Sequence, residues 1–103
     1  MIKYHVCKDQ TITAIRVSGH ANYKKHGEDI VCAAVSTATI LSANLLERMG
    51  FNGDYAVQVE DGFFDLKVIK SNPILEQILI NLSETLNELE LQYPKYIKHQ
   101  KEG

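Results

Sequence analysis

The amino-acid sequence predicts an α+β fold in the order ββαββα, with an antiparallel or mixed sheet and two helices packed on it. Two pairs of stretches with alternating apolar residues predict the strands, and a longer stretch with helical spacing follows each pair. Hairpins followed by helices are typical of the α+β class. A chain of 103 residues can bury its own core, so we expect a single domain over 1–103, with a frayed tail over 95–103.

The four strands form two predicted hairpins, each joined by a short polar turn. The strands are expected at residues 2–7, 11–18, 55–60 and 63–69. Threonine, isoleucine and valine are frequent in the second of these, as strands prefer. Asp61 and Gly62 lie between the last two strands, and this dipeptide is a strong signal for a hairpin turn.

The two helices are predicted from their apolar spacing and from the residues at their ends. The first is expected over about 30–49, with Asp29 as its N-cap and Gly50 after its last turn. Small and apolar residues lie on almost every face, so we expect it to be buried on most sides, in part by a second subunit. The second helix begins at Asn72, which a proline follows, and ends at Tyr93.

Composition and charge argue against several classes of protein. A formal net charge of -2 argues against direct binding of nucleic acid, which usually needs a basic face. The first residues contain no apolar leader segment, and no apolar run reaches the length that crosses a bilayer. We therefore expect a cytoplasmic protein with no membrane partner, in which Cys7 and Cys32 are thiols rather than a disulfide.

A histidine and a cysteine twelve positions apart indicate nucleophilic catalysis. His20 follows the second strand, and Cys32 is expected in the first turn of the first helix, where the helix dipole favours a thiolate. The thiolate would attack a carbonyl, while the imidazole takes the thiol proton and returns it to the leaving group. The polar segment over 22–28 has the length of a movable cover. A competing interpretation makes Cys32 a small apolar core residue.

Two motifs flank that polar segment, G-H-A at 19–21 and G-E-D-I-V-C-A-A-V-S at 27–36. Together they resemble the signature of the ribosomal-processing cysteine proteases, the Prp family, and the resemblance extends over essentially the whole chain. It implies a homodimeric thiol protease without a cofactor, with His20 and Cys32 as the catalytic pair. It also implies the substrate: the N-terminal extension of a large-subunit ribosomal protein, cut after an aromatic residue. Ribosome assembly is expected to depend on this cut.

Several residues near the pair have two possible roles. Asp29 either caps the helix or orients the protonated His20, as the third member of a catalytic triad does. Ser36 lies one helical turn beyond Cys32 on the same face, where it either contacts substrate or packs the helix. Backbone N–H groups near Cys32 could form an oxyanion hole.

The polar segment itself offers further candidates. Tyr23 and His26 are expected to contact the substrate, and exposure to solvent is the simpler alternative. Gly19 and Gly27 stand at the two ends of the segment, where they are expected to act as hinges, with ordinary turn formation as the alternative.

Three other functions compete with proteolysis. His5 and Cys7 share a strand face, but they lack the paired spacing of a structural zinc site, so no metal is predicted. A non-catalytic binding module for ribosome assembly would bury Cys32 as an unreactive thiol. A redox sensor would join Cys7 and Cys32 on oxidation and would not need His20.

Overall fold

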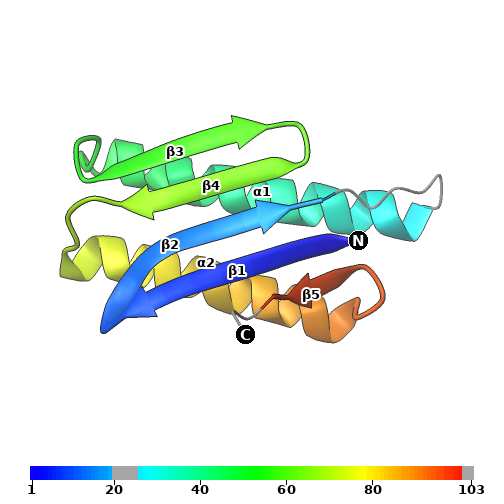
Figure 1. Ribbon diagram of the computed structural model, residues 1–103. Coiled ribbons are helices and arrows are strands. Elements are labelled where there is room, and N and C mark those ends of the chain that lie inside the picture. Colours follow the sequence, from blue (N-terminus) through cyan, green and yellow to red (C-terminus); the bar gives the residue numbers. More distant parts are fainter. Residues whose placement is uncertain (20–25, 101–103) are drawn as a thin grey trace.

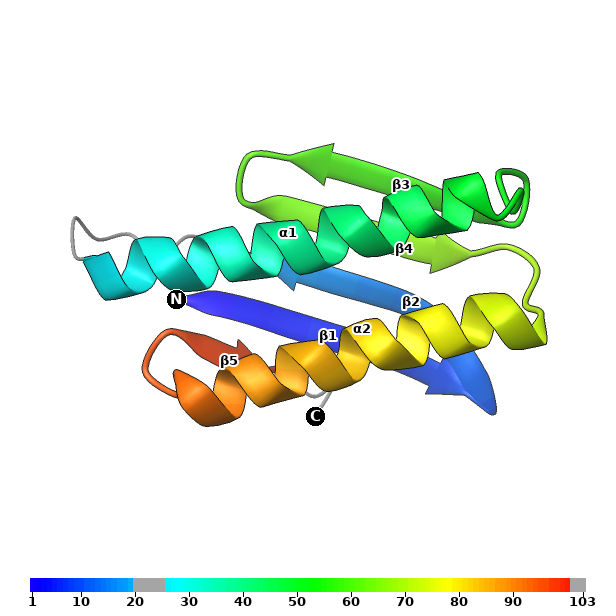
Figure 2. The same ribbon diagram turned by 180° about the vertical axis from the view of Figure 1, so that it is seen from behind.

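The computed structural model describes residues 1–19 and 26–100, with the backbone alone for 26–29. A single sheet forms one layer, and two long helices lie side by side over one of its faces (Figures 1 and 2). The elements in chain order are β1 (Ile2–Asp9), β2 (Thr11–Ser18), α1 (His26–Arg48), β3 (Tyr55–Glu60), β4 (Phe63–Val68), α2 (Pro73–Gln92) and β5 (Ile97–His99). The predicted α+β class and the predicted order of its first six elements are confirmed.

The sheet has five strands in the order β3-β4-β2-β1-β5. The two hairpins meet in the middle, where β2 pairs antiparallel with β4, and only β5 runs parallel to its neighbour β1. Because side chains alternate along a strand, Ile2 and Tyr4 face the helices while Lys3 faces the opposite side. The helix-facing side chains of the central strands, such as Ile15 and Leu66, form the core with the inner faces of α1 and α2.

The end of the chain differs from the prediction. Residues 95–103 were expected to fray, but Ile97–His99 form β5 at the edge of the sheet. The Ile2 N–H donates to the Tyr96 carbonyl at 2.9 Å, and the Ile97 side chain is completely buried. A strand of three residues with a single buried apolar side chain is too short to show alternation, so its pairing with β1 was not evident from the sequence.

The start of α1 also differs from the prediction. The helix begins at His26, so Asp29 lies inside its first turn and is not the N-cap. Gly27 is the second residue of the helix, and Cys32 is the seventh, which places it in the second turn. The prediction failed because Gly27 is a poor helix former and because apolar periodicity starts only at Ile30. Acidic residues in a first turn are nevertheless favourable next to the positive end of the helix dipole.

The expected burial of α1 on most sides is wrong for a single chain. Val31, Val35 and Leu46 on its inner face are buried against the sheet. The outer face is apolar yet open to solvent, and Leu41 on that face is 65% exposed. A second apolar strip lies beside it, because Val59 of the edge strand β3 is half exposed. Several exposed large apolar side chains lie together in this part of the described surface, whereas others, such as Ile69 and Leu91, are exposed elsewhere.

By length and composition alone, the 19-residue segment Ile30–Arg48 could cross a membrane, with a mean hydropathy of 1.6. By that measure, the expectation that no apolar run reaches a spanning length is wrong. The observation is weak evidence for a membrane span, because core helices of soluble proteins and signal sequences pass the same test. In this chain the segment packs on the sheet through Val31 and Leu46, and its outer apolar face accounts for the high hydropathy.

Candidate active site

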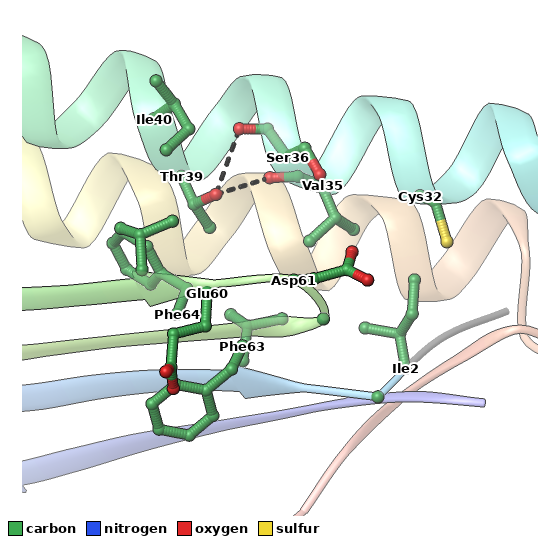
Figure 3. A pocket seen from close by; sticks show the side chains of 14 residues that line it. Ile2, Cys32, Val35, Ser36, Thr39, Ile40, Glu60, Asp61, Phe63 and Phe64 are labelled. Atoms are coloured by element: carbon green, nitrogen blue, oxygen red, sulfur yellow. Dashed lines mark hydrogen bonds between the residues drawn. The ribbon is translucent and has the colours of Figure 1, made fainter.

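A pocket of about 160 Å³ lies between α1 and one end of the sheet. Four segments that are far apart in the sequence meet there: the start of β1, the end of β2, the turn between β3 and β4, and the first half of α1 (Figure 3). Its lining includes Ile2, Gly19, Cys32, Ser36, Asp61 and Phe64. The pocket therefore joins the expected nucleophile to the strand end that precedes the expected base.

Cys32 is half-buried and lines this pocket from α1. The neighbouring Val31 and the residue one turn later, Val35, are buried in the core and fix the orientation of the helix. The Cys32 side chain is directed down toward Ile2 (Figure 3). It thus packs at the margin of the core without being enclosed by it, which leaves the sulfur on the surface of the pocket.

Gly19 is the last residue described before the predicted base, and glycine is required there. Its φ is +102°, a conformation that L side chains rarely adopt, and an added Cβ would clash with the Met1 carbonyl oxygen. The Gly19 N–H donates to the Gly62 carbonyl at 3.0 Å. The end of β2 is therefore held at the pocket, against the chain start and the β3–β4 turn. The expected hinge function of Gly19 stays a prediction.

Ser36 lines the same pocket as Cys32 and is exposed to solvent. Its carbonyl and the Val35 carbonyl both accept hydrogen bonds from the Thr39 hydroxyl, at 3.1 and 3.0 Å (Figure 3). Thr39 in turn is buried, so this turn of α1 is tied to the core on its inner side. The predicted shared face of Cys32 and Ser36 is confirmed, whereas contact of Ser36 with substrate stays a prediction.

The remaining predicted site residues cannot be placed in this pocket. His20 and Tyr23 lie outside the described residues, and His26, Gly27 and Asp29 are described only through their helical backbone in α1. The expected pairing of His20 with Cys32 and the orienting role of Asp29 therefore stay predictions. Of the expected cover over 22–28, residues 26–28 belong to α1, and residues 22–25 lie outside the described residues.

Sequence reasoning missed most residues of the pocket lining, including Ile2, Asp61 and Phe64. Ile2 and Phe64 were assigned only to strands, and Asp61 only to a turn. They reach the pocket because β2 pairs with both β1 and β4, which aligns the chain start and the β3–β4 turn at the same end of the sheet. The sequence contains no signal for which two hairpin strands pair, so this convergence was not predictable.

The two cysteines lie on opposite sides of the sheet. Cys7 pairs with Ala14 on the face turned away from the helices, whereas Cys32 belongs to the helix layer. This separation argues against a disulfide between them. His5, on the same open face as Cys7, makes a 2.6 Å hydrogen bond through Nδ1 to the Gln100 carbonyl. Among the described side chains, those of residues 1–19 and 30–100, no cluster of His, Cys, Asp or Glu is arranged to hold a metal.

A comparison with known protein families identifies the family to which the chain belongs. The family model of cysteine protease Prp matches residues 1–98. The chain belongs to this family. A curated relative, the ribosomal processing cysteine protease Prp of Bacillus subtilis (strain 168), is 32% identical over 57 residues. That match covers 54% of this chain and 51% of the relative, about half the length of each protein.

Solved structures of Prp proteins share the fold. The S. aureus ribosomal processing protease Prp with a substrate peptide has a TM-score of 0.85 and 23% identity, covering 99% of this chain and 100% of that one. The same protease with a covalently linked product peptide gives 0.84 and 24%, with 99% and 100% coverage. A protein from Streptococcus mutans gives 0.80 and 23%, with 98% and 93% coverage. The described sheet and both helices therefore have the fold of these solved structures.

Proposed function

We propose that this protein is a cysteine endopeptidase that removes the N-terminal extension of a large-subunit ribosomal protein, by a cut after an aromatic residue. The observation that carries the proposal is the position of Cys32 in a pocket that also contains Gly19, the residue before His20. Membership of the Prp family and the curated Bacillus relative support it. The cut would take place in the cytoplasm and would be needed for ribosome assembly; no contact with nucleic acid is part of the proposal.

In the proposed reaction, His20 removes the proton from the Cys32 thiol, and the thiolate attacks the peptide carbonyl. The C–N bond breaks as His20 returns that proton to the leaving amine, and a thioester to Cys32 remains. Water, deprotonated by His20, then hydrolyses the thioester and restores the thiol. Because Cys32 lies in the second turn of α1, the helix dipole acts on it more weakly than it would in the first turn. In the proposed reaction, removal of the thiol proton by the His20 imidazole is therefore the main step that forms the thiolate.

The shape of the pocket supports a preference for an aromatic residue before the cut. Ile2, Val17 and Phe64 form an apolar side of the pocket opposite α1. Ligand pockets of this kind combine apolar walls with a few polar groups that orient the ligand. An aromatic ring of the peptide would contact these three side chains while its carbonyl faces Cys32.

A homodimer is the second part of the proposal. The exposed apolar face of α1, including Ile40, Leu41 and Leu45, adjoins the half-exposed Val57 and Val59 of β3. Apolar patches of this kind on a small domain usually mark an interface. A second copy of this chain would cover the patch and complete the burial of α1.

The first experiment is mass spectrometry of a synthetic peptide that spans the extension and the start of the mature ribosomal protein. Wild type is expected to cut it once, after an aromatic residue, and Cys32→Ala is expected to bind it without cutting, a loss of at least about 10³-fold. Cys7→Ala, which removes the other cysteine from the far side of the sheet, is the matched control and keeps full activity. Binding by both proteins with no cut by either would contradict the endopeptidase and favour the non-catalytic binding module.

A further inference from the structure

We propose that the Asp61 carboxylate selects the substrate by pairing with a positively charged side chain of the peptide. This inference rests on the proposed function, because it assigns a specificity-determining residue to the same pocket. Asp61 contacts neither the sulfur nor any reacting group in the proposed reaction, so its role is recognition of the peptide next to the cut.

The position of Asp61 is fixed by the hairpin that carries it. It lies at the β3–β4 turn, between the paired residues Glu60 and Phe63, and Gly62 supplies the positive φ of 72° that the turn needs. The Gly62 carbonyl accepts the hydrogen bond from Gly19, which ties the turn to the end of β2. Figure 3 shows the Asp61 carboxylate directed into the space beneath α1, on the side of Cys32. A rigid hairpin therefore presents a carboxylate beside the expected nucleophile.

Among the described side chains, those of residues 1–19 and 30–100, the Asp61 carboxylate has no hydrogen-bond or ion-pair partner, unlike the carboxylates around it. Its neighbour Glu60 accepts a hydrogen bond from Gln58 at 3.2 Å. Asp65, further along β4, contacts Arg16 at 3.4 Å and Lys67 at 3.8 Å. The described lining of the pocket contains the two acidic residues and no lysine or arginine. A cation that enters the pocket with the peptide would therefore meet a carboxylate that no described side chain neutralises.

Ribosomal proteins supply the complementary charge. They bind an RNA backbone, and neutralising its phosphates requires lysine and arginine. A peptide from such a protein that occupies the pocket would bring an ammonium or guanidinium group within reach of Asp61. Hydrogen bonds between such cations and a carboxylate are roughly twice as strong as those between neutral groups. The pairing would favour basic peptides and disfavour acidic ones.

The test compares kcat/KM on a series of synthetic substrate peptides in which each lysine or arginine is changed singly to glutamine. Wild type is expected to lose roughly five- to tenfold at one of these positions. Asp61→Asn should lose the same factor on the parent peptide and show no further loss on that variant peptide. Asp61→Lys should prefer a peptide with glutamate at the same position. Such a double-mutant cycle isolates the pairwise interaction.

Glu60→Gln is the matched control. It removes the same negative charge from the neighbouring residue, whose carboxylate already accepts a hydrogen bond from Gln58. The proposal is overturned if Glu60→Gln changes the preference as much as Asp61→Asn does, or if Asp61→Asn keeps the preference of wild type. If wild type cuts no peptide, the proposed function fails separately. Fluorescence anisotropy of the labelled peptides then decides the inference, because Asp61→Asn must weaken binding of the basic peptide roughly five- to tenfold.

Discussion

The two helices of this protein have similar lengths, 23 residues in α1 and 20 in α2, yet their exposed faces differ in polarity. In α2, four leucines are buried, the exposed face is mostly polar, and Asn72 caps the start by accepting hydrogen bonds from Ile74 and Leu75. In α1, the exposed face is apolar, and residues from Cys32 to Ile40, more than two turns of the helix, line a pocket. Helix α2 is built for stability alone, whereas α1 combines packing with a site and a candidate interface.

The largest expected effect on stability belongs to the inner face of α2. Leu79 is completely buried, so Leu79→Ala should lower the free energy of unfolding by about 2–5 kcal/mol through lost apolar contact and a cavity. Leu91→Ala, on the same helix but 74% exposed, should change it by less than about 0.5 kcal/mol. Urea unfolding monitored by circular dichroism measures both. Equal effects of the two variants would contradict the contrast between the inner and outer faces of α2.

An intermediate effect is expected on the outer face of α1, and it concerns association rather than folding. Leu41→Glu places a charge in the proposed interface and should weaken the homodimer at least about tenfold, measured by sedimentation equilibrium. The control is Leu91→Glu, which puts the same charge on the equally exposed outer face of α2 and should leave the dimer intact. Monomeric wild type, or dissociation by both variants, would show that the apolar face of α1 is not the interface.

The smallest expected effect concerns Glu90, near the end of α2. Its carboxylate accepts hydrogen bonds from the His99 N–H at 3.1 Å and the Tyr4 hydroxyl at 2.8 Å, and these lower the pKa of Glu90 below its ordinary 4.5. Burial and the bond to Glu90 raise the pKa of Tyr4, which therefore stays a donor. The folded state thus binds the Glu90 proton more weakly than the unfolded state does. This contribution to stability is present above pH 4.5 and is lost as the pH falls through the folded pKa.

Glu90→Gln tests this linkage. The variant keeps an oxygen acceptor but cannot titrate. Its free energy of unfolding, measured by urea unfolding, should therefore fall less than that of wild type between about pH 5 and pH 3, by a difference below about 1 kcal/mol. Glu88→Gln, exposed on the same helix, should keep the pH dependence of wild type. A Glu90→Gln curve parallel to wild type would mean that the contact with β5 does not depend on the charge.

The sequence predicts local structure well and misses what depends on pairing between distant segments. Strands 11–18 and 55–60 and the N-cap Asn72 are found where predicted, because alternation and capping are local signals. Cys32 was singled out from its chemistry and its motif, and it lies in the pocket, while its catalytic role stays a prediction. The early start of α1 was missed because Gly27 opposes helix formation locally, and β5 because its stability comes from β1. Asp61 lies at the pocket because β2 pairs with β4, and the sequence does not indicate this pairing.

The pairing of β5 with β1 also bears on the order in which the pocket forms during folding. Ile2 lines the pocket, and its pairing partner Ile97 lies far away in the sequence. Contacts between such distant positions form late, because the chain between them must be ordered first. Both hairpins and both helices can form while β1 still has an open edge. We therefore expect the pocket to take its final shape only once β5 has paired with β1.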